Sequence, residues 1–138
     1  MSGLSGHCLC GAVTYTVSAE PVMVVNCHCT HCQRQSGAAF STNVVVPRDS
    51  LAVEGETLSE YVTTAEDEEK PTRRLFCSNC GSPVASLAEY LPEIAFVKSG
   101  TLDDTSVVKP GMDAWTSSAM SWVDFAHSER QQLERGRP

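Results

Sequence analysis

The sequence lacks long hydrophobic runs. Its apolar stretches, such as residues 22–25 and 44–46, are the size of a β-strand, whereas a membrane-spanning helix needs about 20 consecutive apolar residues. Positive charge is also scarce, because 10 lysine and arginine residues stand against 17 acidic ones and give a formal net charge of −7. Proteins that neutralise nucleic-acid phosphates or anionic lipid need the opposite sign. We therefore expect neither a nucleic-acid partner nor a membrane partner.

The chain also lacks an internal repeat, a low-complexity tract and a Pro/Gly/Ser-rich linker. Its 138 residues, 41% of them hydrophobic, suit one domain with its own core. The first residues have neither the basic start nor the apolar stretch of a secretory signal. The cytoplasm is therefore the expected compartment.

Short β-type runs separated by turn residues dominate the pattern and predict an all-β fold with few short helices. The expected strands cover residues 12–17, 22–26, 39–46, 58–62, 73–76, 84–87 and 94–98. Residues 30–36 are expected to form one or two helical turns, and the polar segment 126–135 is helix-prone. The acidic run at 66–69 is expected to be a solvated loop with no chemistry of its own.

Cysteine is the residue type that carries a functional signal. The seven cysteines fall into three short motifs, which are Cys8-x-Cys10, Cys27-x-Cys29-x-x-Cys32 and Cys77-x-x-Cys80. An odd count with such tight spacing favours metal binding over disulfides in a reducing compartment. Because zinc prefers four tetrahedral ligands, the cysteines divide naturally into a set of four and a set of three.

The set of four would pair Cys8 and Cys10 with Cys77 and Cys80 around a structural zinc. Such a closed site adds folding energy, because the unfolded chain has no preformed cage of thiolates. A glycine follows each pair, at positions 11 and 81. A turn with positive φ at these glycines would let the backbone wrap around the metal.

The set of three, Cys27, Cys29 and Cys32, would leave the fourth position of a zinc ion open, as in catalytic zinc sites. Two alternatives remain at this point. His28 or His31 could complete a closed tetrahedron, although the residue between two ligands of an extended segment points away from the metal. Cys29 and Cys32 could instead cycle through a disulfide, although thioredoxin-like motifs occur in α/β chains.

Longer motifs around these cysteines resemble the glutathione-dependent formaldehyde-activating enzyme family, which shares its domain type with centromere protein V. The residues that carry the resemblance are His7-Cys8-x-Cys10-Gly11-Ala12-Val13, Asn26-Cys27-His28-Cys29-x-His31-Cys32-Gln33-Arg34-Gln35-Ser36-Gly37, Phe76-Cys77-x-Asn79-Cys80-Gly81-Ser82-Pro83 and Gly100-Thr101-Leu102-Asp103-Asp104. The resemblance implies a zinc-binding β-tent domain over about residues 4–126, followed by a polar tail over residues 127–138.

The resemblance also implies two zinc ions per chain, a structural one on Cys8, Cys10, Cys77 and Cys80 and a catalytic one on Cys27, Cys29 and Cys32. The activity it implies is that of a carbon–sulfur lyase, which joins formaldehyde or another small aldehyde to glutathione as co-substrate. A non-catalytic two-zinc module and a thiol-redox enzyme are the alternative functions, because a shared fold does not fix the reaction.

Glutathione carries two carboxylates, so an acidic protein that binds it needs local positive charge or backbone donors. The candidates nearest the second cysteine set are Arg34, Ser36 and Gly37. More distant basic residues are secondary candidates, namely Arg73, Arg74, Lys98 and Lys109. Trp115 and Trp122 are expected to pack in the core.

Overall fold

A computed structural model describes residues 3–64 and 70–135 of the chain. The acidic run at 66–69 and the last three residues of the expected tail lie outside the described residues. Strands dominate, so the prediction of a mainly β fold is confirmed. Within the described ranges, no helix has the length and apolar character needed to cross a membrane.

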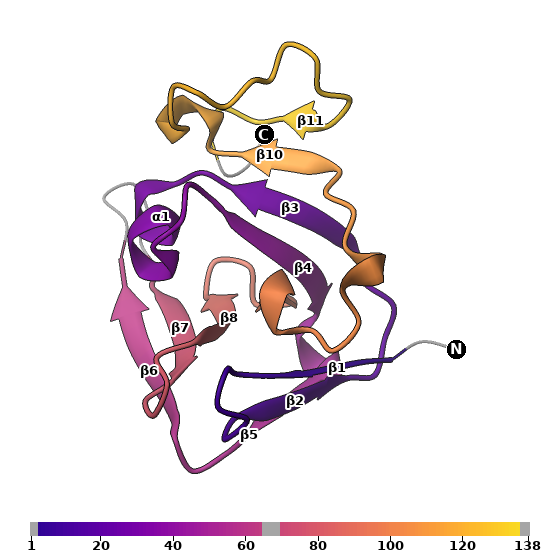
Figure 1. Ribbon diagram of the computed structural model, residues 1–138, viewed down its shortest axis with the longest axis vertical. Coiled ribbons are helices and arrows are strands. Elements are labelled where there is room, and N and C mark those ends of the chain that lie inside the picture. The colour runs from indigo at the N-terminus through magenta and orange to yellow at the C-terminus, as the bar shows by residue number, and fades with distance from the viewer. Residues whose placement is uncertain (1–2, 65–69, 136–138) are drawn as a thin grey trace.

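The strands form two sheets (Figure 1). In chain order they are β1 (Leu4–His7), β2 (Thr14–Val17), β3 (Met23–Cys27), β4 (Ser41–Pro47), β5 (Leu51–Glu54), β6 (Leu58–Thr63), β7 (Thr72–Cys77), β8 (Pro83–Ala88), β9 (Ile94–Lys98), β10 (Met112–Ala114) and β11 (Gln131–Gln132). The small sheet has the order β1-β2-β5, and the large sheet has the order β11-β10-β3-β4-β9-β8-β7-β6. Most neighbours are antiparallel, but β10 runs parallel to both β3 and β11.

One α-helix, α1 (Thr30–Ser36), follows β3. Short 3₁₀ turns lie at Arg48–Ser50, Ser99–Thr101, Thr105–Val107 and Thr116–Ser118. The expected strands are found with their ends within two residues, and the expected helix at 30–36 has the predicted bounds. The helix expected over residues 126–135 is wrong, because this segment forms β11 and pairs with β10. Backbone pairing with a neighbouring strand here overrides local helix propensity.

The hydrophobic core lies between the two sheets. Alternate residues of the central strands of the large sheet, such as Val44 and Val46 of β4 and Val97 of β9, are fully buried and form one hydrophobic cluster with Tyr15 and Val17 of β2. The two-residue period of a strand sends every other side chain to one face. The residues between these core positions therefore face the opposite side of the large sheet.

That opposite face of the large sheet lines a cavity. Asn43 and Val45 of β4 line it, as do Phe96 and Lys98 of β9, and further lining residues come from β3, β7, β8 and β10. Six neighbouring strands can line one cavity only if the sheet curls around it, and Figure 1 shows this curl between β3 and β7. The fold thus creates a partly enclosed space on the side of the sheet opposite the main hydrophobic core.

Candidate functional site

Four cysteines, two near the start of the chain and two from its middle, meet at one place. The sulfurs of Cys8, Cys10, Cys77 and Cys80 all lie within 4.8 Å of one another. The Sγ of Cys10 is 3.7 Å from that of Cys8 and 3.8 Å from that of Cys77. Around a zinc ion with Zn–S bonds of about 2.3 Å, the sulfurs of a regular tetrahedron are about 3.8 Å apart. This four-thiol cluster therefore has the size that a zinc ion requires.

Two matching turns form the four-thiol cluster. The amide of Gly11 donates to the carbonyl of Cys8 at 3.1 Å, and the amide of Gly81 donates to that of Cys77 at 2.7 Å. The φ angles of the two glycines are 82° and 80°, in the left-handed region that a glycine adopts without steric cost. The prediction of positive φ at both glycines is confirmed.

Neutral donors surround the four sulfurs in the described part of the chain. Asn79 Nδ2 donates to the Sγ of Cys10 at 3.2 Å, and the hydroxyl of Thr57 lies 3.2 Å from the Sγ of Cys77. The hydrogen bond from Thr57 lowers the pKa of Cys77, and one from Ser82 lowers the pKa of Cys80 to about 5. These hydrogen bonds favour the thiolate at Cys77 and Cys80, which is the metal-binding form of cysteine, whereas the pKa of Cys10 is raised.

The other three cysteines lie where β3 passes into α1. Cys27 ends β3, Cys29 is the N-cap of α1 and Cys32 lies in its first turn, and their sulfurs are within 4.8 Å of one another. The Sγ of Cys29 accepts a hydrogen bond of 3.3 Å from the amide of Cys32. The three-thiol cluster is therefore fixed by a helix cap, which satisfies one of the free amides of the first turn.

No histidine within the described ranges belongs to either thiol cluster. His28 points away from its cysteine neighbours and is fully buried, with its ring against Phe40 and Phe125. Its Nε2 lies 2.9 Å from Oδ1 of Asp113. This arrangement argues against the alternative in which a histidine closes the three-thiol site.

Asp113 of β10 is a buried link behind the three-thiol cluster. Besides His28, it accepts hydrogen bonds from Nε of Arg130 at 2.6 Å and from Nδ2 of Asn26 at 3.3 Å. Burial alone would raise the pKa of Asp113, but these three hydrogen bonds lower it below its ordinary value. Because Asn26 and His28 flank Cys27, the link connects the C-terminal segment to the thiol-bearing turn.

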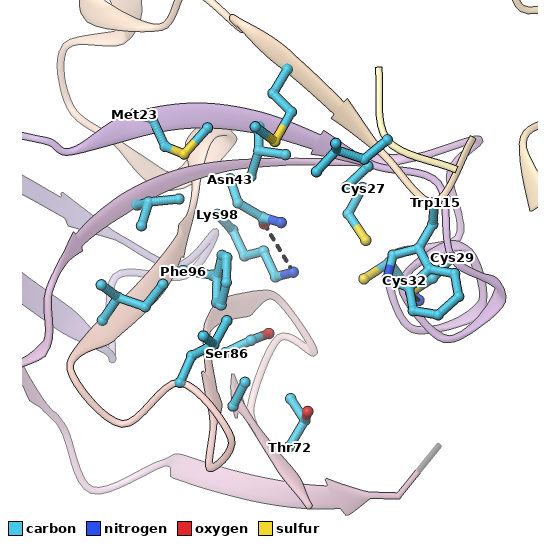
Figure 2. Close-up of a pocket in the computed structure, with 18 of the residues that line it drawn as sticks. Met23, Cys27, Cys29, Cys32, Asn43, Thr72, Ser86, Phe96, Lys98 and Trp115 are labelled. Atoms are coloured by element: carbon cyan, nitrogen blue, oxygen red, sulfur yellow. Dashed lines mark hydrogen bonds between the residues drawn. The ribbon is translucent and has the colours of Figure 1, made fainter. Parts of the chain in front are cut away.

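The three-thiol cluster opens into a cavity of about 290 Å³. Figure 2 shows Cys27, Cys29 and Cys32 at one side of this cavity, together with Trp115. Met23 and Phe96 lie at the other side, and Lys98 lies between the two sides. The four-thiol cluster does not contribute to this cavity.

Two buried cations face the three-thiol cluster. Lys98 Nζ donates to Oγ of Ser41 at 2.9 Å and to Oδ1 of Asn43 at 3.1 Å. Arg74 Nη1 lies 3.8 Å from the Sγ of Cys32, and Arg74 Nε donates to Thr63. Burial lowers the pKa of the Lys98 ammonium.

The pKa of Cys32 is lowered first by its two cysteine neighbours and then by the two cations. Hydrogen bonds from Cys27 and Cys29 lower its pKa well below the ordinary thiol value, and the positive charges of Lys98 and Arg74 lower it further. A thiolate is therefore favoured at Cys32.

The three candidates for glutathione contacts that are nearest to the cysteines in the sequence lie outside the cavity. Arg34 and Gly37 are exposed, and neither they nor Ser36 line the cavity. Gly37 is the C-cap of α1 with φ of 70°, and the hydroxyl of Ser36 donates to the carbonyl of Cys32 at 2.7 Å. Both residues thus have an evident local role in ending the helix.

The cations that do line the cavity come from distant strands, with Arg74 in β7 and Lys98 in β9. In the sequence, each of them is a charged residue within a predicted strand. The residue two positions before it, Thr72 or Phe96, also lines the cavity. The sequence pattern placed both residues among the secondary candidates, because distance along the chain hid their proximity to the cysteines.

The two tryptophans differ from each other. Trp122 is 68% exposed, so the expectation that it packs in the core is wrong. Trp115 packs against the small hydrophobic cluster of Val25, Val45 and Ala114, and it also lines the cavity beside the three-thiol cluster. Trp115 has φ of 57°, a left-handed conformation that is costly for a bulky residue. The backbone around it is held by the C-terminal segment, because the amide of Trp115 donates to the carbonyl of Arg135.

Comparisons with known proteins agree with this geometry. Two curated relatives carry the name "Putative glutathione-dependent formaldehyde-activating enzyme". The one from Halomonas elongata is 27% identical over 98% of this chain and 88% of its own length. The one from Penicillium rubens is 32% identical over 54% of this chain, which corresponds to 38% of that protein.

A solved structure and a family model extend the comparison. The crystal structure of a Rhodobacter sphaeroides protein matches with a TM-score of 0.55 at 17% identity, covering 94% of this chain and 98% of that chain, and supports the fold. The sequence model of glutathione-dependent formaldehyde-activating enzymes matches residues 3–118, which include both thiol clusters. The chain therefore belongs to the glutathione-dependent formaldehyde-activating enzyme family.

Proposed function

We propose that this protein is a zinc-dependent carbon–sulfur lyase that joins formaldehyde, or another small carbonyl compound, to glutathione or a related thiol. The observation that carries the proposal is the three-thiol cluster, which opens into a cavity with two buried cations. The names of the curated relatives support glutathione and formaldehyde as the reactants.

The residues present fit zinc at both clusters. Four sulfurs at tetrahedral spacing suit a closed structural site, and three sulfurs at the end of a cavity suit a site with one open position. When bound by Cys27, Cys29 and Cys32, zinc supplies a position at which a substrate thiol loses its proton.

The side chains of the cavity then serve the carbonyl reactant. As the thiolate sulfur attacks the carbonyl carbon, a C–S bond forms and one electron pair of the C=O bond moves to oxygen. The oxygen then takes a proton from water, and the proton that the thiol released to solvent restores that water. Lys98 has three N–H groups, and two of them donate to Ser41 and Asn43. The third can donate to the oxygen as its negative charge develops.

Two further groups support this assignment. Ser86 lines the cavity, and its buried hydroxyl has no hydrogen-bond partner within the described residues. It is therefore available to a ligand that Lys98 also contacts. Arg74, next to the Sγ of Cys32, supplies positive charge for an anionic ligand at the thiol end.

Calorimetric titration of glutathione into the zinc-loaded protein tests the proposal, with zinc counted per chain and the titration repeated on Cys29→Ala. We expect two zinc ions and saturable binding in the wild type, and one zinc ion and no binding in the variant. Two zinc ions without glutathione binding would favour a non-catalytic two-zinc module. A Cys29–Cys32 disulfide that forms on mild oxidation of the zinc-loaded protein would favour a thiol-redox enzyme.

A further inference from the structure

The cavity has an apolar half that the proposed reaction of formaldehyde does not use. Five side chains, which we call the apolar lobe, line it on the side away from the thiols, and they are Met23, Val45, Ile94, Phe96 and Met112. They pack as one hydrophobic cluster together with Val25, Ala114 and Trp115, the last of which lies at the thiol side. Figure 2 shows Met23 and Phe96 of this lobe across the cavity from Cys29 and Cys32.

The cavity is larger than formaldehyde, the smallest carbonyl compound, requires. Its volume of about 290 Å³ is at the lower end of the range for cavities that bind organic ligands. Formaldehyde contributes a single carbon, and Figure 2 shows Lys98 between the thiols, where this carbon would react, and the apolar lobe. The remaining space is therefore available to a substituent on one of the two reactants.

The chemistry of the apolar lobe restricts that substituent. The charged residues lining the cavity are Arg74 and Lys98, and Lys98 already donates to Ser41 and Asn43. A carboxylate or ammonium placed against Met23, Ile94 and Phe96 would lose its hydration without a partner. A hydrocarbon group placed there would be stabilised by leaving water.

We infer that the adduct made or cleaved at the three-thiol cluster carries an apolar substituent of several carbons, which the apolar lobe binds. This inference rests on the proposed function, because it takes the same thiols as the reacting end. The substituent can belong to the thiol or to the aldehyde. Both sources present the same chemistry to the apolar lobe, a hydrocarbon chain within a few bonds of the sulfur.

The first arm of the test measures thiol binding. Ethanethiol, propanethiol, butanethiol and pentanethiol are titrated into the zinc-loaded protein by calorimetry. If the chain enters the apolar lobe, affinity rises by about fourfold for each added methylene group, which corresponds to roughly 0.8 kcal/mol. Equal affinity across the series would overturn the assignment of the lobe to the thiol.

Matched variants show whether the gain comes from the apolar lobe. Met23→Gln and Met112→Gln keep a side chain of similar length but place an amide in the lobe. We therefore expect the factor by which affinity rises for each added methylene group to fall from about four toward one. Met120→Gln makes the same change at a 40% exposed position outside the cavity and keeps the wild-type gain. An unchanged gain in both lobe variants would contradict the inference. If neither variant folds with two zinc ions, the wild-type series decides.

The second arm measures aldehydes with glutathione as the thiol. Exchange between free aldehyde and the glutathione adduct is followed by NMR for formaldehyde, butanal and hexanal, with and without enzyme. An acceleration that is at least tenfold greater for butanal or hexanal assigns the lobe to the aldehyde. A flat thiol series together with acceleration of formaldehyde alone would refute the inference and leave the proposed function intact.

The opposite pattern separates the two claims. Suppose that affinity rises along the alkanethiol series, but the protein accelerates exchange of no glutathione adduct. This result would support binding of a hydrocarbon chain by the apolar lobe and would refute glutathione-dependent turnover. No thiol binding and no acceleration would refute both.

Discussion

The two thiol clusters differ in what surrounds them. The sulfurs of the four-thiol cluster contact neutral donors, including Asn79 and Thr57, and the cluster ties the β1–β2 turn to the β7–β8 turn. The three-thiol cluster lies within one short segment, faces Lys98 and Arg74, and opens into a cavity. The first arrangement joins distant parts of the chain, whereas the second leaves room for a reactant.

If zinc is bound at both clusters, as we propose, the number of thiolates gives a reason for the positions of the cations. Four thiolates around Zn²⁺ carry a net charge of −2, which amide and hydroxyl donors near the surface can stabilise. Three thiolates around Zn²⁺ carry a net charge of −1, and a bound substrate thiolate would make it −2 in a largely apolar cavity. Two buried cations compensate that charge. We therefore interpret the four-thiol cluster as structural and the three-thiol cluster as reactive.

The largest effect should come from breaking the four-thiol cluster. Cys77 is fully buried, and Cys77→Ala removes one corner of the closed site. Structural zinc contributes on the order of 10–16 kcal/mol in small zinc domains, as much as the whole stability of a typical domain. We expect no cooperative thermal unfolding transition for this variant. Cys29→Ala, the matched change in the other cluster, should keep the transition; similar loss in both would erase the distinction between the clusters.

The next largest effect should come from the buried link behind the three-thiol cluster. Asp113→Ala leaves Arg130 and His28 without their buried partner. Loss of one member of a buried charge pair costs about 3–5 kcal/mol, which urea unfolding would measure. We also expect zinc affinity at the three-thiol cluster to fall by about 10–100-fold, as for residues that orient metal ligands. Unchanged zinc affinity would show that the link supports the fold alone.

Replacement of the buried ammonium should separate binding from turnover. Lys98→Met keeps a long side chain between the thiols and the apolar lobe but removes the donor to the carbonyl oxygen. We expect the rate of adduct exchange to fall by about 100-fold, as when one oxyanion donor is lost. The count of two zinc ions should stay the same. A rate within threefold of wild type would refute this role of Lys98.

The smallest effects should distinguish two neighbouring arginines. Arg74→Gln removes the cation next to Cys32, and we expect glutathione binding to weaken about tenfold, or roughly 1.4 kcal/mol. Arg73 lies on the other face of β7 and pairs with the partly exposed Glu60. Arg73→Gln should therefore change stability by less than about 1 kcal/mol and leave glutathione binding unchanged. Equal loss of glutathione binding in both variants would show that general charge, and not position, matters.

Local patterns predicted most of the fold. The strand at Ile94–Lys98 and the helix at Thr30–Ser36 were predictable because alternation and a capped turn are local signals. The short strands β1, β5 and β10 were not expected, because three or four residues carry too little periodicity. The C-terminal segment was misassigned because its structure depends on pairing with β10, which is a tertiary contact.

The site was predictable only in part, for the same reason. Spacing along the chain was enough to group the cysteines as the structure groups them. The cations were harder, because Arg74 and Lys98 reach the cavity through the register of the large sheet. The apolar lobe also depends on that register, since its residues come from four different strands.

One measurement tests the difference between the two clusters most directly. The protein is loaded with two Co²⁺ ions, and its sulfur-to-cobalt charge-transfer absorption is recorded while glutathione is added. If the three-thiol cluster is open and the four-thiol cluster is closed, the absorption rises as one additional thiolate binds, and it saturates at one glutathione per chain. An absorption that stays constant with both cobalt ions bound would contradict the account.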